Sequence, residues 1–383
     1  MFAKTELDHV RADVVGSLLR PARWKEARLN LERGKLSAAE FARVELECVR
    51  GHLALQEEIG LDVVTDGDIS RLNFQDSFGL AVRGYDAGAE SIGSQERRAG
   101  STPLARWDIP DLAARGTPVV HRRPVVERLQ LKRNVPLEEY RRAAPLASKP
   151  VKVSLIGPDR IMQRYDHAAS KSVYASVDAF LADVVAIQRR MIGELVAAGC
   201  RYVHIDEPGY TAYVDEPSLA AMRKRGEDPT ENFGRSLRAN AELVRGFPGV
   251  TFGIHLCRGN QRSMWHREGT YDAIAERLFN ELPYQRFLLE YDSPRAGSFA
   301  PLRYVPKDKV VVLGLLSTKV PELETADALV RRIEEAAKHV PLERLAISPQ
   351  CGFGSDVVGN LISEDDQKRK LERVVEVARR VWQ

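Results

Sequence analysis

The sequence is poor in cysteine, in long apolar runs and in excess charge of one sign. Four cysteines in 383 residues are too few for a disulfide framework, which favours a reducing compartment, the cytoplasm. No window approaches the roughly 20 consecutive apolar residues of a membrane helix, and residues 1–13 lack the apolar core of a secretory signal. The net charge of +3 is too small to indicate a polyanionic partner. We therefore expect a soluble cytoplasmic protein with no nucleic acid and no membrane as partner.

Short apolar runs recur along the chain, and helical periodicity follows most of them. Each run is bounded by Gly, Pro or Asp, as buried parallel strands tend to be. The eight candidate strands cover residues 13–17, 62–66, 151–156, 202–206, 251–257, 286–290, 309–314 and 345–348. The clearest helical stretches are residues 37–60, 176–199, 325–339 and 364–381. Eight strands that alternate with helices predict a single α/β domain over residues 1–383, folded as a (β/α)8 TIM barrel.

One connection is longer than this pattern requires. Residues 69–150 separate the second predicted strand from the third, and a helical crossover does not need that length. The segment contains many glycines and prolines, which are typical of loops. We therefore expect an insertion between the second and third strands, built as a hairpin or a small lid.

Polar residues occupy the ends of the predicted strands. In a barrel of this kind, functional groups gather where the strands run into the loops at the C-terminal face. In chain order the residues at these positions are Ser17, Asp66, Asp68, Asp206, Glu207, His255, Cys257, Glu290, Asp292 and Cys351. A barrel with a purely structural role would not need them there, so the sequence predicts a functional site at this mouth.

His255 and Cys257 form the sharpest motif at these ends. Residues two apart on a strand point to the same side, so both side chains can face one metal ion. Glu290 ends the next predicted strand, and Cys351 follows the eighth. Imidazole and thiolate are zinc ligands, and a weakly held fourth ligand leaves room for a substrate. We predict a catalytic zinc site of His255, Cys257, Glu290 and Cys351.

The remaining cysteines and one strand histidine have simpler interpretations. Buried cysteines are usually inert small hydrophobic residues. Cys48 falls within a predicted helix and Cys200 precedes a strand, so we assign neither a function. His204 lies inside a predicted strand and is interpreted as a satisfied core histidine.

The charge of the proposed ligand set narrows the chemistry. Two thiolates and a carboxylate more than neutralise Zn2+, which makes the ion a poor Lewis acid toward water. A substrate thiol that binds it still loses its proton. The resulting thiolate remains nucleophilic at neutral pH. This indicates attack on an alkyl group rather than hydrolysis of an amide.

The motifs at the strand ends resemble those of the cobalamin-independent methionine synthases, specifically their zinc-bearing C-terminal domain. The resemblance covers nearly the whole chain. Within the family, the chain is most similar to the short, single-barrel members. The matching stretches are Val15-Gly-Ser17, Thr65-Asp-Gly-Asp68, Ile205-Asp-Glu-Pro208, His255-Leu-Cys-Arg-Gly-Asn260, Leu289-Glu-Tyr-Asp292, Val312-Leu-Gly-Leu315 and Ser348-Pro-Gln-Cys-Gly352. The resemblance implies the same four zinc ligands.

The resemblance also implies a binding site for the amino acid part of homocysteine, formed by Ser17, Asp68 and Asp206. Two carboxylates beside a hydroxyl suit an ammonium group. The family has a glutamate where this chain has Asp68, whose side chain is shorter. Arg258 and Asn260, just past the fifth strand, are candidates for positioning the second substrate.

Two departures from the family concern the alkyl donor. The family has a tryptophan shortly after a Gly-Pro pair, a flat surface for the pterin of methylfolate. Residues 157–165 contain no tryptophan here, and Arg164 or Tyr165 would take its place. The family's full-length members also have a histidine after the seventh strand, where Lys319 is the nearest ionisable residue in this chain. The thiol side of the site therefore matches the family, and the donor side differs.

Three functions remain open. The first is a zinc-dependent methyltransferase that makes methionine from homocysteine, with methylfolate, a methylated corrinoid protein or another methyl compound as donor. The second is a thiol alkyltransferase of the epoxyalkane:coenzyme M transferase type, whose sulfonate would need cations. The cations available near the strand ends are Arg20, Arg71, Arg258 and Lys319.

The third is a non-catalytic barrel that keeps zinc for structure or for binding a thiol. Structural zinc sites have four firm ligands, and a carboxylate ligand argues against that function. Asp68 and Asp206 favour the first function over the second, because carboxylates suit the ammonium of homocysteine.

Overall fold

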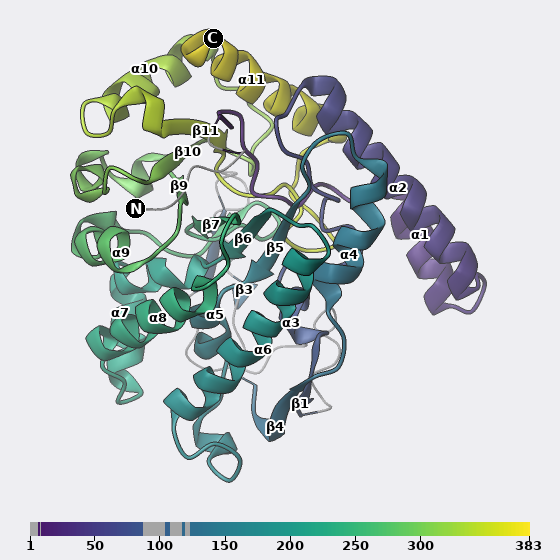
Figure 1. Ribbon diagram of the computed structural model, residues 1–383, viewed down its shortest axis with the longest axis vertical. Coiled ribbons are helices and arrows are strands. Elements are labelled where there is room, and N and C mark those ends of the chain that lie inside the picture. Colours follow the sequence, from purple (N-terminus) through teal and green to yellow (C-terminus); the bar gives the residue numbers. More distant parts are fainter. Residues whose placement is uncertain (1–6, 8, 87–103, 108–116, 119–122) are drawn as a thin grey trace.

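A six-stranded parallel sheet forms the centre of the protein, with helices around it (Figure 1). The computed structural model describes residue 7 and residues 9–86, 104–107, 117–118 and 123–383. The strands are β5 (Lys152–Ile156), β6 (Tyr202–Asp206), β7 (Thr251–Leu256), β9 (Arg286–Glu290), β10 (Val310–Leu316) and β11 (Leu345–Pro349). Their order across the sheet is β11-β10-β9-β7-β6-β5. Within the described residues, no helix is long and apolar enough to cross a membrane.

Helices connect these strands, and the four predicted helical stretches are confirmed. These four are α2 (Ala38–Ile59), α6 (Val177–Ala197), α10 (Ala326–Ala337) and α11 (Glu364–Trp382). The others are α1 (Ala22–Glu32), α3 (Asp76–Gly79), α4 (Val135–Ala143), α5 (Pro158–Gln163), α7 (Glu216–Lys224), α8 (Pro229–Val244) and α9 (Ala275–Glu281). Ser37 starts α2 with a capping box, and Gly60 ends it in the left-handed conformation, with φ 94°.

Six of the eight predicted strands are present to within two residues at either end. The prediction of strands at residues 13–17 and 62–66 is wrong. The chain instead makes one isolated parallel bridge at each place, from Ala12 to β11 and from Val64 to the residue before β5. The two segments lie along opposite edges of the sheet, where the first and second strands of a barrel would lie. Closure into a complete barrel remains a prediction.

Side chains explain why these two segments are not strands. The side-chain amide of Gln56 accepts from the N–H of Thr65 at 3.1 Å and donates to its carbonyl at 2.7 Å. The carboxylate of Asp13 accepts from the N–H of Val14 at 2.8 Å. A strand uses its backbone N–H and C=O groups to pair with neighbouring strands. Because side chains occupy some of these groups here, the two segments pair with the sheet at only one bridge each.

The segment predicted as an insertion, residues 69–150, contains antiparallel strands as well as α3 and α4. Its strands are β1 (Val82–Tyr85), β2 (Leu104–Trp107), β3 (Thr117–Pro118) and β4 (Val125–Leu131). β1 pairs with β4, and β2 pairs with β3 and with β8 (Met264–Trp265), which comes from the loop after β7. The rest of the segment, residues 87–103, 108–116 and 119–122, lies outside the described residues. Its assignment as a lid remains a prediction.

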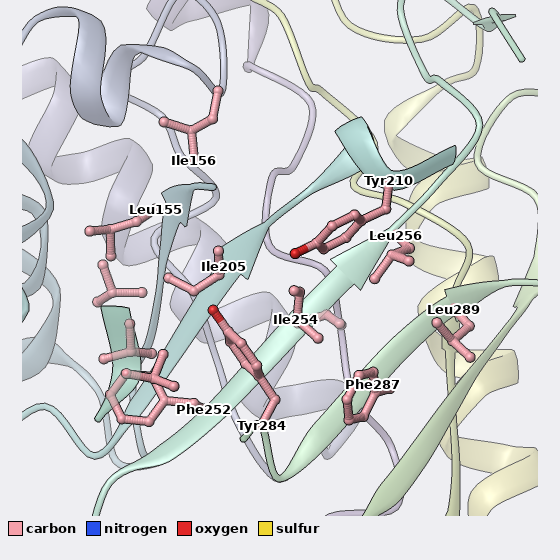
Figure 2. Close-up of a cluster of buried hydrophobic side chains, with 14 of the residues drawn as sticks. Leu155, Ile156, Ile205, Tyr210, Phe252, Ile254, Leu256, Tyr284, Phe287 and Leu289 are labelled. Carbon is pink, nitrogen blue, oxygen red and sulfur yellow. The ribbon is translucent and has the colours of Figure 1, made fainter. Parts of the chain in front are cut away.

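Side chains alternate between the two faces of the parallel sheet. Leu155, Ile205, Ile254 and Phe287 stand opposite one another in register on neighbouring strands. Figure 2 shows these four side chains together in a buried apolar cluster. Because successive residues of a strand point to opposite faces, the alternate positions, such as His255, point to the other face. The apolar pattern therefore determines which face carries the polar residues.

A buried ion cluster joins the N-terminal segment to the sheet. Asp13 accepts hydrogen bonds from Lys152 at 2.8 Å, from Arg286 at 3.2 Å and from the Tyr202 hydroxyl at 2.7 Å. No residue of this cluster is more than 2% exposed. Burial would raise the pKa of Asp13, but Lys152 and Arg286 outweigh it and lower the pKa below its usual range. Asp13 thus balances the charges of Lys152 and Arg286. Its three partners are the first residues of β5, β6 and β9.

We expect Asp13→Asn to lower the free energy of unfolding by roughly 3–5 kcal/mol, because it leaves buried cations without a counter-charge. Urea denaturation followed by circular dichroism measures this loss. Arg23→Gln is the control, since it breaks an exposed ion pair with Glu47 and should change the free energy by less than about 1 kcal/mol. A loss in Asp13→Asn no larger than in the control would contradict the role of this cluster.

Candidate active site

Strand register brings the candidate residues to one end of the sheet. Asp206, the last residue of β6, stands opposite His255 of β7. Glu290, the last residue of β9, stands opposite Gly314 of β10. Cys257 follows β7 directly, and Cys351 lies in the loop after β11. Because parallel strands end at the same edge, these side chains collect there.

His255, Cys257 and Cys351 form a compact buried cluster. Their ligand-type atoms all lie within 4.8 Å of one another, and Cys351 Sγ lies 3.5 Å from His255 Nε2. The three residues are 2%, 5% and 6% exposed. Both cysteines are free thiols. One imidazole and two thiols suit a tetrahedral zinc ion, so the fold brings together three of the four predicted ligands.

The two thiols perturb each other's ionisation. Contact with Cys351, and secondarily with the His255 imidazole, lowers the pKa of the Cys257 thiol against the opposing effect of burial. The contact with Cys257, together with burial, raises the pKa of Cys351. The pair therefore favours one thiolate, which is the form that binds metals.

Glu290 lies beside this cluster without being part of it. One carboxylate oxygen accepts a hydrogen bond from the backbone N–H of Arg258, and the other lies 3.7 Å from the ammonium of Lys319. Among the described residues, the group whose ligand atoms meet within 4.8 Å does not include Glu290. Burial raises the pKa of Glu290 to about 7, although Lys319 opposes this. Its role as the fourth ligand remains a prediction.

Asp206, predicted to bind the substrate's ammonium group, is linked to the cluster through His204. His204 Nε2 lies 3.4 Å from Asp206 Oδ1, and the rings of His204 and His255 stack with their centroids 5.8 Å apart. Burial lowers the pKa of His204 to about 4, so its imidazole is neutral at pH 7. Burial would raise the pKa of Asp206, but the contact with His204 outweighs it and lowers the pKa. His204 is buried as expected, but it is not fully satisfied, because its Nδ1 has no hydrogen-bond partner among the described residues. It also orients Asp206, which the sequence did not indicate.

Asp68 approaches the same end of the sheet from the segment beside β5. Its backbone is left-handed, with φ 53°. Its carboxylate accepts from the Ser154 hydroxyl at 3.2 Å and lies 3.4 Å from Arg71. Burial raises the pKa of Asp68, and the negative charge of Asp206 adds to this effect. The two predicted ammonium-binding carboxylates therefore lie within electrostatic range of each other.

Ser17 lies against the loop that carries Cys351. A Cβ added to Gly352 would lie 2.0 Å from Ser17 Oγ, so glycine is required there. Arg20, which is 2% exposed, holds this arrangement together. Its guanidinium donates to the carbonyl oxygens of Leu18, Gly354, Asp68 and Arg71. Arg20 thus joins the loops that carry Ser17, Asp68 and Cys351.

Arg71 and Arg258, predicted to contact substrate, are bound by the chain itself. The guanidinium of Arg71 pairs with the carboxylate of Glu139 through two nitrogens, at 2.9 and 2.6 Å. Arg258 donates to the carbonyl of Gly269 at 2.9 Å and lies over the Tyr271 ring, 4.4 Å from its centre. Both arginines are therefore held in place by the chain, and their contact with substrate remains a prediction.

Asn260, also predicted to contact substrate, holds the loop of Cys351, and its contact with substrate remains a prediction. Its amide nitrogen donates to the carbonyl of Gly352 at 2.6 Å, and its oxygen accepts from Asn360 at 2.9 Å. The same amide nitrogen lies 3.2 Å from the Thr318 hydroxyl. Asn260 therefore connects the loops after β7, β10 and β11.

A pair of buried carboxylates beside the cluster was not predicted. Glu207 accepts from the backbone N–H groups of Asp159 and Arg160, at 2.9 and 2.8 Å, and from the Asn240 amide at 3.0 Å. Burial, with the charge of Asp159, raises the pKa of Glu207 to about 8, and burial raises that of Asp159 to about 6. The sequence placed Glu207 at a strand end, but only the fold shows that it anchors the start of α5.

Three comparisons relate the chain to known proteins. The family model described as cobalamin-independent synthase, catalytic domain, matches residues 11–225 and 290–379. The uncharacterized proteins YxjH and YxjG of Bacillus subtilis (strain 168) are 32% and 34% identical over 375 and 378 residues, 97% of this chain and 94% of each relative. The methionine synthase of Pyrococcus abyssi (strain GE5 / Orsay) is 24% identical over 352 residues, 91% of this chain and 87% of that protein.

Solved structures share the fold. A putative vitamin-B12 independent methionine synthase from Listeria monocytogenes matches with a TM-score of 0.72 at 24% identity, over 97% of this chain and 98% of that chain. A B12-independent methionine synthase from Shewanella sp. W3-18-1, solved in complex with selenomethionine, matches with a TM-score of 0.70 at 18% identity, over 97% of both chains. These likenesses show an α/β fold of the TIM-barrel type with a parallel sheet.

We expect Cys351→Ser to lose bound zinc, because a neutral hydroxyl replaces a thiolate ligand. Metal analysis after dialysis should find about one zinc per chain in the unchanged protein and only a small fraction of that in the variant. Cys200→Ser is the control, since Cys200 is also fully buried but lies outside the cluster. If Cys351→Ser kept as much zinc as Cys200→Ser, the ligand assignment would be wrong.

Proposed function

Because the chain belongs to the cobalamin-independent methionine synthase family, we propose that it is a zinc-dependent thiol alkyltransferase that methylates homocysteine and forms methionine. The observation that carries this proposal is the buried cluster of His255, Cys257 and Cys351, with Asp206 in register beside it. The cluster suits a metal ion that binds a thiol. The carboxylate suits the ammonium group of the same substrate.

The donor set of the cluster fits zinc. His255, Cys257 and Cys351 would hold the ion, and Glu290 beside them would serve as a weak fourth ligand that a substrate displaces. Buried Glu290 Oε1 accepts no hydrogen bond from a described residue and faces the ammonium of Lys319 at 3.7 Å, so this oxygen has no hydrogen bond to give up on binding a metal ion. A bound zinc ion would lower the pKa of a substrate thiol, so that the thiol is present as the nucleophilic thiolate at neutral pH.

Asp206, Asp68 and Ser17 would bind the amino acid end of homocysteine. The two carboxylates accept charge-assisted hydrogen bonds from the ammonium group. Because neighbouring strands lie about 4.8 Å apart, an ammonium group at Asp206 leaves the thiol of a short side chain within reach of His255. Arg20 holds the surrounding loops by four hydrogen bonds to backbone carbonyls, so the site is formed before the substrate arrives.

A reaction of the epoxyalkane:coenzyme M transferase type is the alternative thiol chemistry, and its sulfonate would need free cations. Arg20, Arg71 and Arg258 donate to groups of the chain itself. Lys319 faces two carboxylates, at 3.7 Å from Glu290 and 3.4 Å from Asp292. These contacts engage the four cations that the sequence offered for a sulfonate head group, which favours homocysteine over coenzyme M at the position of Asp206.

Calorimetric titration of the zinc-loaded protein tests this proposal. Homocysteine should bind saturably and release about one proton per molecule bound, measured in buffers of different ionisation enthalpy. Asp206→Asn should weaken homocysteine binding by roughly tenfold or more, because it removes a charge-assisted hydrogen bond to the ammonium group. Its zinc content should stay unchanged.

The control is Asp272→Asn, which removes an exposed carboxylate and should bind homocysteine like the unchanged protein. Coenzyme M binding with proton release, and no response to homocysteine, would replace the proposal with the sulfonate-thiol alternative. No response to either thiol would contradict both.

A further inference from the structure

Arg160 is a buried arginine whose guanidinium has no partner among the described residues. It lies in α5, directly after β5, and is only 7% exposed. No described residue accepts a hydrogen bond from this guanidinium or forms an ion pair with it. The carboxylate of Glu207 binds the backbone N–H of Arg160 and not its side chain. An unpaired buried charge is unfavourable for folding, so it indicates a group kept for a ligand.

A second guanidinium, that of Arg267, reaches the same helix from the loop after β7. It donates to the side-chain oxygen of Gln163, three residues after Arg160, at 2.9 Å, and to the backbone carbonyl of Pro208. Another of its nitrogens lies 3.5 Å from the Thr211 hydroxyl, which donates to the carbonyl of Cys257 at 2.7 Å. No carboxylate in the described part of the chain forms an ion pair with Arg267. Arg160 and Arg267 therefore bring two guanidinium groups, neither of them in an ion pair with a described residue, close to Cys257.

The electrostatic effects on neighbouring groups support this placement. Burial, with the charges of Arg267 and Arg164, lowers the pKa of Arg160 to about 9, while Cys257 opposes the shift. Burial, with Arg160 and Arg267, lowers the pKa of His266 to about 3, so its imidazole is neutral. The positive charges of Arg160 and Arg267 thus both act on Cys257, although no carboxylate of the described residues forms an ion pair with either of them.

We propose that Arg160 and Arg267 bind an oxyanion group of the alkyl donor (a carboxylate, phosphate or sulfonate) and so hold the donor beside the substrate thiol. Guanidinium groups match such anions through paired charge-assisted hydrogen bonds. Arg160 belongs to residues 157–165, the stretch without the family's tryptophan, where the donor side of the site differs. The assignment to the donor rests on the proposed function, whereas the anion site itself does not.

Inorganic phosphate is the probe for this site. Phosphate should bind the zinc-loaded protein saturably by calorimetry and should raise its melting temperature with increasing concentration. Arg160→Gln should weaken phosphate binding by about tenfold or more. Arg160→Lys should restore part of the phosphate affinity, because lysine returns the positive charge without the paired N–H donors of the guanidinium. The matched control is Arg235→Gln, whose arginine already pairs with Asp178 at 2.7 Å and Glu231 at 2.6 Å. It should bind phosphate like the unchanged protein.

Thermal unfolding separates a ligand-binding role from a structural one. Without phosphate, Arg160→Gln should melt at the same temperature as the unchanged protein or higher, because the arginine it replaces has no partner. A clearly lower melting temperature would assign Arg160 to the structure and overturn the inference. If Arg160→Gln does not fold, Arg267→Gln carries the phosphate test.

Competition distinguishes the sources of the anion. Displacement of phosphate by 5-methyltetrahydrofolate, with homocysteine binding unchanged, would place the anion on the alkyl donor. Displacement by coenzyme M instead would overturn the assignment to the donor and the methionine-forming proposal, while the anion site would stand. Absence of phosphate binding, or equal binding by Arg160→Gln, would overturn the anion site whichever thiol binds.

Discussion

The parallel pairing of β6 with β7 sets Asp206 opposite His255, and the rest of the site follows from that register. A shift of one residue in a strand would exchange its two faces. Ile205 and Ile254 would then leave the apolar cluster, and the polar side chains would enter it. Burial of the apolar face therefore fixes which side chains meet at the strand ends. The chemistry of the site depends on this packing as much as on the site residues themselves.

Loops between the strands are held in place by buried side chains that bind backbone groups. Arg20 and Asn260 donate to carbonyl oxygens of the loop that contains Cys351. Arg258 places its backbone N–H against Glu290 and its side chain against Gly269. Arg20 and Arg258, which the sequence offered as cations for a sulfonate, therefore position the loops of the site. Arg160 differs from them because no described residue accepts a hydrogen bond from its side chain.

Much of the fold could be predicted from the sequence, because the buried strands and capped helices carry local signals. The first two strand predictions failed because the side chains of Gln56 and Asp13 bind backbone groups, and such local competition leaves the apolar pattern unchanged. The wrong predictions therefore fall at the edges of the sheet, where side chains replace neighbouring strands.

In the candidate site too, local signals could be recognised in the sequence, whereas contacts between distant segments could not. The spacing of His255 and Cys257 on one strand is a local signal, and their meeting with Cys351 followed from the barrel hypothesis. The surroundings of Glu290 depend on Arg258 and Lys319, which reach it from other loops. The meeting of Glu207 with the start of α5 and the approach of Arg160 and Arg267 to Cys257 depend on distant segments in the same way. No spacing in the sequence carries that information.

X-ray absorption at the zinc edge, before and after addition of homocysteine, tests the central claim most directly. The resting protein should show two sulfur ligands at about 2.3 Å and lighter ligands at about 2.0–2.2 Å. Homocysteine should add a third sulfur at the same distance and remove a light ligand. A zinc site without sulfur, or a spectrum that homocysteine leaves unchanged, would contradict the account.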